Sequence, residues 1–223
     1  MKNQNKEQDA LTGFLTHTAF EKQFAQYLQE AIEKGEALSL AVADLDSFRR
    51  FNNTYGQGSG NDALRKMAES FRQHIPENAI AGRFGGEEFI VLFPKTEREE
   101  AFLAIERIRL DWDTEREFSD GQNIINAKLT LSGGVAAYPA DGTTVAEILR
   151  KAEQALYRAK VSGRNRICIA QEERMIPKTA HYTATQLERL SRLAKEQEVP
   201  ESLLLREALD CLLRKYTVSE KLS

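Results

Sequence analysis

Two apolar runs of strand length meet at Arg83-Phe84-Gly85-Gly86-Glu87-Glu88-Phe89. The runs cover residues 79–84 and 88–93. A Gly-Gly pair between two such runs predicts a β-hairpin, because tight hairpin turns need positive φ angles. The turn also carries two neighbouring carboxylates, Glu87 and Glu88. This stretch therefore predicts the local fold and marks a place where carboxylate chemistry can occur.

A second pair of carboxylates follows a predicted central strand. The continuous apolar run at residues 38–43 is typical of a buried strand, and Asp44-Leu45-Asp46 comes directly after it. If the hairpin lies beside this strand, three or four carboxylates gather at one edge of the sheet. Such a cluster is costly unless cations neutralise it, and oxygen ligands favour Mg²⁺ held jointly with a triphosphate. Each piece alone also fits a simpler interpretation, a helix N-cap for Asp-Leu-Asp and a plain turn for Gly-Gly.

Helical and strand patterns alternate over the first 170 residues. Helices are predicted at residues 19–34, 61–75, 97–117 and 145–160, with a short helix from Ser47 and a glycine-rich loop holding Gly56, Gly58 and Gly60. Further strands are predicted at residues 124–138 and 166–170. This alternation, together with one hairpin, indicates an α/β sandwich with a mixed or antiparallel sheet.

Several motifs, in this order and at matching spacing, resemble the GGDEF family of diguanylate cyclases over residues 9–170. Besides the hairpin stretch they are Asp9-Ala10-Leu11-Thr12-Gly13, Asp44-Leu45-Asp46-Ser47-Phe48-Arg49, Thr130-Leu131-Ser132-Gly133-Gly134-Val135, Ala155-Leu156-Tyr157-Arg158-Ala159-Lys160 and Gly163-Arg164-Asn165. Arg49 stands where the family has Lys. The resemblance implies a palm-like nucleotidyl cyclase, an α/β sheet flanked by helices.

The resemblance implies an enzyme that condenses two nucleoside triphosphates, GTP first of all, into cyclic di-GMP with release of pyrophosphate. Glu87, Glu88 and Asp44 are the implied catalytic carboxylates, with Glu88 in a supporting or base-like role. Two Mg²⁺ ions, or Mn²⁺, would be held by Asp44, Glu87 and the Leu45 carbonyl. Each subunit of a homodimer would bring one triphosphate, so that each 3′-hydroxyl attacks the α-phosphate on the other subunit.

The implied substrate-binding residues fall into four groups. Gly85 and Gly86 let the backbone approach the phosphates, Lys160 and Arg164 take the terminal phosphates, Phe48 and Arg49 supply backbone amides and a cation, and Asn52 and Asn61 lie in the stretch that reads the base. The family's product-inhibition motif, RxxD, is replaced by Pro76-Glu77-Asn78-Ala79. Feedback inhibition through that motif is therefore not expected.

Asn61 departs from the family, which has an Asp there to accept from guanine N1–H and N2–H₂. An amide offers one acceptor and one donor, so its NH₂ group mismatches guanine but pairs with the N1/N6 edge of adenine. One hypothesis is that base choice is relaxed or shifted toward ATP or a mixed product. The alternative is that Asn61 still accepts one hydrogen bond and GTP remains the substrate.

The last part of the chain has a different pattern, with an extended piece predicted at residues 179–183, a helix at 185–197, a turn at Val199-Pro200 and a second helix at 202–216. Residues 171–178 are predicted to be a linker between a cyclase domain (1–170) and a module at residues 179–223. Residues 178–216 resemble a ribbon–helix–helix domain, most closely in Val199-Pro200-Glu201-Ser202-Leu203-Leu204-Leu205-Arg206-Glu207-Ala208-Leu209. In that family two chains pair their strands into a ribbon that enters the major groove. The resemblance implies that Thr179, His181 and Thr183 contact bases and that the helix N-terminus at Ser202 contacts a phosphate.

The charge of the tail leaves DNA binding and pure dimerisation both open. From Gln171 onward there are nine basic and nine acidic residues, and Glu196, Glu198 and Glu201 crowd the expected phosphate contact. Either role supplies a two-fold axis, which a cyclase needs. The other function class is a DNA-binding transcription regulator whose GGDEF domain only senses a nucleotide or cyclic dinucleotide.

Composition bounds these hypotheses. The 223 residues are 41% hydrophobic and 29% charged, with a net charge of −3, which excludes a disordered chain and argues against a globally basic nucleic-acid binder. Two cysteines cannot build a disulfide framework. No apolar run approaches the ~20 residues of a membrane span, and the N-terminus is polar. The expected location is the cytoplasm, without membrane contact.

Overall fold

The computed structural model describes residues 7–171 and 179–196, and beyond them residues 201, 202, 204, 205, 208, 209 and 212. The chain divides into two compact units, residues 1–173 and 174–223, and each is described by itself.

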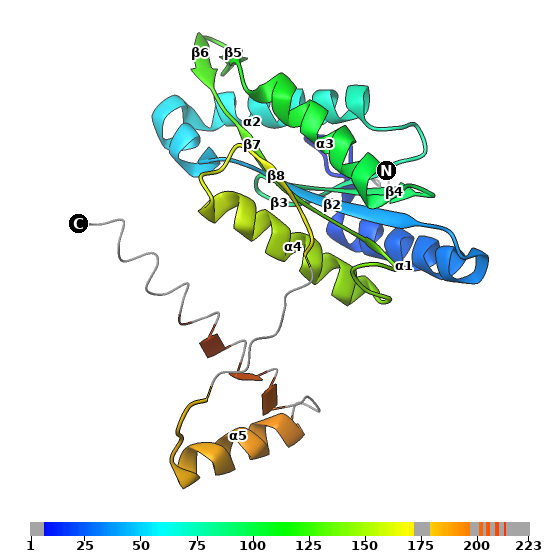
Figure 1. Cartoon of the computed structure of the whole chain (residues 1–223). Coiled ribbons are helices and arrows are strands. Elements are labelled where there is room, and N and C mark those ends of the chain that lie inside the picture. Colours follow the sequence, from blue (N-terminus) through cyan, green and yellow to red (C-terminus); the bar gives the residue numbers. More distant parts are fainter. Residues whose placement is uncertain are drawn as a thin grey trace, which may run out of the picture. The chain divides into compact units, whose positions relative to one another are not determined.

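The first unit is built on one mixed sheet (Figure 1). Its elements in chain order are β1 (Leu15–Thr16), α1 (His17–Lys34), β2 (Leu38–Leu45), α2 (Phe48–His74), β3 (Ile80–Gly85), β4 (Glu88–Pro94), α3 (Arg98–Trp112), β5 (Glu115–Ser119), β6 (Ile124–Lys128), β7 (Leu131–Tyr138), α4 (Val145–Val161) and β8 (Ile167–Ile169). The strand order is β1-β3-β4-β2-β7-β8, and β5 and β6 pair separately. The β3–β4, β4–β2 and β2–β7 pairs are antiparallel, whereas β1–β3 and β7–β8 are parallel. The predicted α/β fold with a sheet flanked by helices is confirmed.

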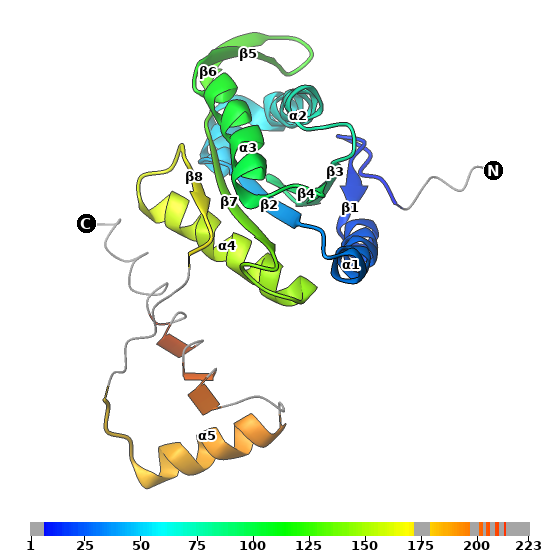
Figure 2. The same ribbon diagram turned by 45° about the vertical axis from the view of Figure 1, so that its right-hand side comes forward.

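Helices cover both faces of the sheet, as Figure 2 shows. Alternate residues of β2 enter two separate cores: Ala41, Ala43 and Leu45 pack with α2 and α3, and Leu40 and Val42 pack with α1 and α4. All eight residues of β2 are buried. Because β2 is covered on both faces, it is apolar up to Asp44 except at Ser39, whose buried hydroxyl donates to the Thr96 carbonyl at 2.8 Å.

The predicted hairpin lies next to the predicted central strand. β4 runs antiparallel to β2 with Asp44 opposite Glu88, and β3 pairs with β4 on its other side. Gly86 has a φ of 34°, the positive value expected of the Gly-Gly turn. The end of β2 and the β3–β4 turn therefore meet at one edge of the sheet.

Two element predictions were wrong in detail, and a third stretch is divided between two sheets. The glycine-rich stretch is not a loop, because α2 runs from Phe48 to His74 and only Gly56, with φ 83° and ψ 161°, interrupts it. The predicted helix at 97–117 ends at Trp112, and its last residues form β5, where Phe118 packs against Trp112. The strand residues predicted at 124–138 are divided between two strands, β6 and β7, in different sheets.

The second unit contains helix α5 (Ala184–Glu196), close to the predicted helix at 185–197. Thr183 caps it: its hydroxyl accepts from the Gln186 N–H at 3.3 Å, and the Gln186 side chain accepts from the Thr183 N–H at 2.9 Å. Residues 179–183, expected to be extended, have no regular secondary structure. The described residues between 201 and 212 are helical, and the predicted Val199-Pro200 turn lies outside the described residues.

Among the described residues, no helix is both long and apolar enough to cross a membrane.

Candidate active site

Asp44 is the buried centre of the carboxylate cluster. It lies near the end of β2, between Glu88 on β4 and Ser132 on β7, and only 5% of its surface is exposed. Its Oδ2 lies 2.8 Å from the Nζ of Lys160 on α4. Burial raises the pKa of Asp44 to about 6, with the charges of Glu87 and Glu88 adding to the rise and Lys160 opposing it. Ionising the Asp44 carboxylate is therefore unfavourable in this structure, even with Lys160 beside it.

The β3–β4 turn brings Glu87 to the end of β2. The Leu45 N–H points to the Glu87 carbonyl at 3.4 Å, and Glu87 is half-buried while Glu88 is exposed. A Cβ placed on Gly85 or Gly86 would meet no atom within 4 Å. These glycines therefore leave open space above the turn, which fits their implied role beside phosphates.

Sequence reasoning missed the contact that fixes this turn. The Arg83 guanidinium donates to the Gly86 carbonyl at 2.6 and 3.1 Å and to both oxygens of Asp9 at 3.1 Å. Asp9 in turn accepts from the N–H and hydroxyl of Thr12. The signal was present, since Asp9 opens the first motif and Arg83 opens the hairpin motif. These two motifs form one clamp that holds the turn.

Asp46 does not belong to the carboxylate cluster, so the cluster has three of the three or four carboxylates expected at this edge. Its carboxylate accepts from the Thr130 hydroxyl at 2.8 Å, the Ser132 hydroxyl at 2.7 Å and the Asn165 N–H at 3.0 Å. A carboxylate with three donors is already satisfied. The cluster consists of Asp44, Glu87 and Glu88.

The donors at this edge fit a hard divalent cation. In the described part of the chain no three His, Cys, Asp or Glu side chains are grouped as metal ligands. However, the expected set needs only two carboxylates, Asp44 and Glu87, and the Leu45 carbonyl. In an antiparallel pair the N–H and C=O of one residue face the same neighbour, so the Leu45 carbonyl also faces the turn. Oxygen donors around a buried carboxylate with a raised pKa suit Mg²⁺.

The implied phosphate-binding residues surround the same edge. Lys160 lies at the end of α4, and Arg164 lies in the loop that follows, exposed and with a positive φ of 64°. Arg49 is exposed in the first turn of α2. The side chain of Phe48 is buried and stacks on Phe51, so that only its backbone is available to a ligand.

The expected base pocket contains an unpaired polar atom. Among the described residues, the buried Oδ1 of Asn52 has no hydrogen-bond partner. A Cβ on Gly60 would lie 1.8 Å from that atom, so Gly60 is the residue that makes room for Asn52. Asn61 follows Gly60 and is exposed. Buried polar atoms without partners are uncommon in proteins and here indicate a place where a ligand donor can bind.

The candidate DNA-binding residues all lie in the second unit. Thr179, His181, Thr183 and Ser202 are exposed. The hydroxyl of Thr183 is already used as the cap of α5.

Comparison with known proteins agrees with this geometry. A family model described as "Diguanylate cyclase, GGDEF domain" matches residues 6–166. The chain belongs to the GGDEF family. A second family model, for the ribbon–helix–helix domain, matches residues 177–217.

The similar proteins include cyclases from several bacteria. The chain is 33% identical over 166 residues to diguanylate cyclase A of Treponema denticola, which covers 71% of this chain and 44% of that protein. It is 32% identical over 161 residues to a diguanylate cyclase of Vibrio cholerae (72% and 49%). It is 35% identical over 157 residues to the cyclic di-GMP phosphodiesterase NbdA of Pseudomonas aeruginosa (70% and 20%). The chain thus spans less than half the length of these curated relatives.

Solved structures resemble the first unit. The GGDEF domain of DgcB from Caulobacter crescentus, in complex with c-di-GMP, matches with a TM-score of 0.71 and 29% identity, covering 77% of this chain and 97% of that one. The active GGEEF domain of a diguanylate cyclase from Vibrio cholerae matches with a TM-score of 0.63 and 33% identity, covering 68% and 94%. Like that domain, this chain has Glu as the third residue of the motif, Glu87.

Proposed function

We propose that this chain is a Mg²⁺-dependent diguanylate cyclase that joins two GTP molecules into cyclic di-GMP and releases two pyrophosphates. The observation that carries the proposal is the buried Asp44 beside Glu87, with Lys160 as its counter-ion and two open glycines above it. A nucleotide sensor needs a pocket, but it has no need for a buried carboxylate beside a half-buried one, since only a metal would balance their combined charge fully.

Each side chain has a distinct part in this reaction. Asp44 and Glu87, with the Leu45 carbonyl, hold the cations, and bound Mg²⁺ would supply charge neutralisation at the phosphates and a more acidic 3′-hydroxyl. Lys160 and Arg164 bind the β- and γ-phosphates, and Gly85 and Gly86 let the backbone approach them. Arg49 adds a cation, and Phe48 contributes only its backbone amide.

The bond changes require two subunits. The 3′-oxygen on one subunit forms a bond to the α-phosphorus on the other, the bond from that phosphorus to pyrophosphate breaks, and the 3′-proton passes to water. Repeating the step in the opposite direction closes the ring. We propose that the C-terminal module provides the homodimer. The apolar side chains of Leu187 and Leu193 on α5 are each 44% exposed, and a ribbon–helix–helix domain buries such residues against a second copy.

GTP is the proposed substrate, and the base selectivity depends on Asn52 and Asn61. The Asn52 amide, whose Oδ1 has no partner among the described residues, can pair with either purine, since an amide has both a donor and an acceptor. Asn61 lacks the second acceptor that guanine prefers. We therefore expect weaker discrimination against ATP than an Asp at this position would give, by about tenfold for one mismatched hydrogen bond. Asn61→Asp should restore the preference for GTP in a competition assay, and equal selectivity in both proteins would contradict this expectation.

The second proposed activity is DNA binding through the C-terminal module, supported by the match to the ribbon–helix–helix family and by the exposed Thr179, His181 and Ser202. If the module served only dimerisation, His181→Ala would leave DNA affinity unchanged because there would be none to lose. If the whole chain were a regulator that merely senses nucleotide, it would bind DNA without making product.

The test is a paired substitution in the carboxylate cluster. Glu87→Gln should abolish Mg²⁺-dependent pyrophosphate release from GTP, because a metal ligand is lost, whereas the exposed Glu88→Gln should retain a substantial part of it. A gel-shift assay on both variants should show unchanged DNA binding. Pyrophosphate release that survives Glu87→Gln would contradict the proposed metal site.

A further inference from the structure

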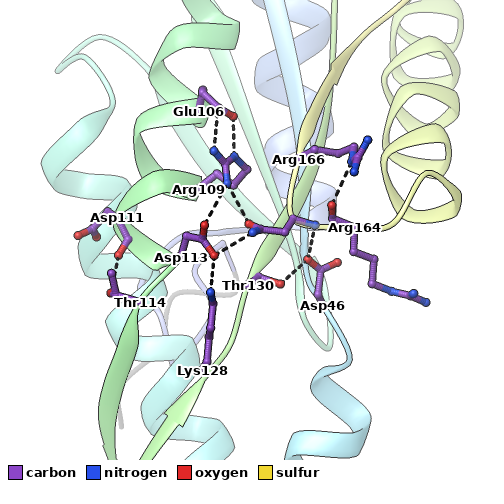
Figure 3. Close-up of polar contacts among 11 residues, drawn as sticks. Asp46, Glu106, Arg109, Asp111, Asp113, Thr114, Lys128, Thr130, Arg164 and Arg166 are labelled. Atoms are coloured by element: carbon purple, nitrogen blue, oxygen red, sulfur yellow. Dashed lines mark hydrogen bonds and ion pairs between the residues drawn. The ribbon is translucent and has the colours of Figure 1, made fainter.

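The loop after α4 holds Arg164 in an unusual backbone conformation. Arg164 and Asn165 have consecutive positive φ angles of 64° and 46°, which residues other than glycine seldom adopt and which Asn tolerates best. The Arg164 guanidinium makes no hydrogen bond or ion pair with any described residue and points away from its neighbours (Figure 3). The loop therefore has a strained backbone and presents a guanidinium with no partner among the described residues. Contacts from the surrounding structure must stabilise this backbone conformation.

The main chain of the loop is attached to the sheet through Asp46. The Asn165 N–H donates to Asp46 Oδ2 at 3.0 Å. Asp46 is 6% exposed, and its carboxylate accepts hydrogen bonds from two hydroxyls. One belongs to Ser132 on β7, and the other belongs to Thr130, directly before β7. Asp46 lies two residues after Asp44, so the loop is tied to the same strand end that forms the carboxylate cluster.

The side chain of Asn165 joins the loop to the end of α3. Its Nδ2 donates to Asp113 Oδ1 at 2.8 Å, and its Oδ1 accepts from Arg109 at 3.0 Å. Both partners are themselves fixed: Arg109 donates twice to Glu106, at 2.8 and 2.6 Å, and Asp113 pairs with Lys128 at 2.7 Å. Figure 3 shows this cluster, with Arg109, Asp113 and Lys128 on one side and Asp46 on the other. An amide can accept from the guanidinium and donate to the carboxylate at once, which a carboxylate cannot do.

We propose that Asn165 is a positioning residue, which clamps the loop between Asp46 and the Arg109–Asp113 pair so that the Arg164 guanidinium is fixed at the terminal phosphates of a bound triphosphate. The inference rests on the proposed phosphate-binding role of Arg164. Asn165 itself need not touch the nucleotide, and it acts through Arg164.

The main test is a charge-preserving exchange. Asn165→Asp keeps the size of the side chain and its tolerance of positive φ. However, the Nδ2 group that donates to Asp113 becomes a carboxylate oxygen, so that two carboxylates face each other. Binding of the Mg²⁺ complex of GTP with a methylene bridge between its α- and β-phosphates, measured by titration calorimetry, should weaken by about tenfold. Adding Asp113→Asn restores one donor and one acceptor in reversed order, and binding should return to within about threefold of the original. No recovery in the double variant would overturn the proposal.

A double-mutant cycle separates positioning from general loss of structure. If Asn165 acts through Arg164, Asn165→Asp should add nothing to the loss caused by Arg164→Ala, whereas independent effects would multiply. Multiplying losses would overturn the proposal, and so would wild-type binding by Asn165→Asp alone. Thermal melting of each variant shows whether it is folded. If a single variant is not folded, the double variant Asn165→Asp with Asp113→Asn still tests the proposal.

Because binding is measured separately from turnover, the role of Asn165 and the proposed cyclase activity can fail independently. Arg164-dependent binding of the analogue by a chain that makes no cyclic dinucleotide would contradict the proposed function and leave the role of Asn165 standing. Normal turnover together with unchanged binding by Asn165→Asp would contradict the role of Asn165 alone. A wild-type chain that does not bind the analogue would overturn both.

Discussion

At the scale of single residues, Asp44 and Asp46 show what a motif does and does not reveal. They are two positions apart in one sequence motif, and both are buried. Their roles differ because of partners that are distant in the sequence: Lys160, Glu87 and Glu88 surround Asp44, whereas Thr130, Ser132 and Asn165 saturate Asp46. The motif predicted that the site has carboxylates, but only the three-dimensional contacts distinguish Asp44, which pairs with Lys160, from Asp46, which accepts three hydrogen bonds.

Asp44 should make the stability of the metal-free protein depend on pH. Its pKa in the folded state is raised to about 6, above the ordinary value of 3.8, so folding favours the protonated form. The stabilisation is complete below about pH 4 and is lost as the pH rises through about 6, by about 3 kcal/mol in total. Asp44→Asn should abolish this dependence. Urea unfolding of both proteins in EDTA from pH 4 to 8 measures it, and a constant difference between them would show that the pKa is not raised.

Two glycines should separate stability from activity. A Cβ on Gly134 would lie 2.0 Å from the Ala152 carbonyl of α4, so Gly134→Ala should lower the free energy of unfolding by about 2–4 kcal/mol. Gly85 has open space around it, so Gly85→Ala should change stability by less than about 0.5 kcal/mol while weakening triphosphate binding. Chemical denaturation and calorimetric binding provide the two measurements. The reverse pattern would mean that Gly85 is structural and that α4 does not pack on β7 as described.

At the scale of elements, the sequence predicted the strands that carry the carboxylates better than it predicted the β5–β6 hairpin, which packs against α2 and α3. The apolar run of β2 and the Gly-Gly hairpin predicted the strands, and the turn accounts for the pairing of β3 with β4. That β4 also pairs with β2 was only a condition of the sequence argument, and the structure supplies it, with Asp44 opposite Glu88. The β5–β6 hairpin was missed, since the polar residues 115–117 continue a helical pattern. Tertiary contacts decide there: Phe118 is fully buried against Phe51 and Trp112.

That hairpin is attached to α2 directly after Asn61. The Asp62 carboxylate accepts from the Ser119 N–H at 2.9 Å and pairs with Lys66 at 3.0 Å. Asp62→Ala should destabilise the protein by about 1–2 kcal/mol and shift the emission of Trp112, the only tryptophan, to longer wavelength. Glu69→Ala, an exposed position on the same helix, is the matched control. Unchanged fluorescence in Asp62→Ala would indicate that the hairpin is held by its apolar side chains alone.

At the scale of the whole molecule, two units of different families lie in one chain. The net charge of −3 comes entirely from the part before Gln171, where 22 basic residues face 25 acidic ones, and the rest is neutral. The motifs predicted both families, and the comparisons confirm both. The sequence could not predict how two catalytic units meet, because that depends on contacts between chains.

Dimerisation through the second unit should control product formation. Leu187→Glu with Leu193→Glu places two charges on the exposed apolar face of α5 and should shift the chain to a monomer, because a buried interface cannot accommodate unpaired carboxylates. Ile32→Glu is the control, since Ile32 on α1 is similarly exposed at 43%. Sedimentation velocity gives the oligomeric state, and product formation should fall by more than about tenfold only in the α5 variant. A dimer that persists in that variant would assign the interface to another surface.

The central claim is that the buried Asp44, the Glu87 turn and the Lys160–Arg164 end of α4 form a cyclase site. The most direct measurement is mass spectrometry of the products made by the full chain from GTP, ATP or both, with Mg²⁺ or Mn²⁺. The account predicts cyclic di-GMP from GTP, two pyrophosphates for each product molecule, and no product from Glu87→Gln. Triphosphates recovered intact from every mixture would contradict it.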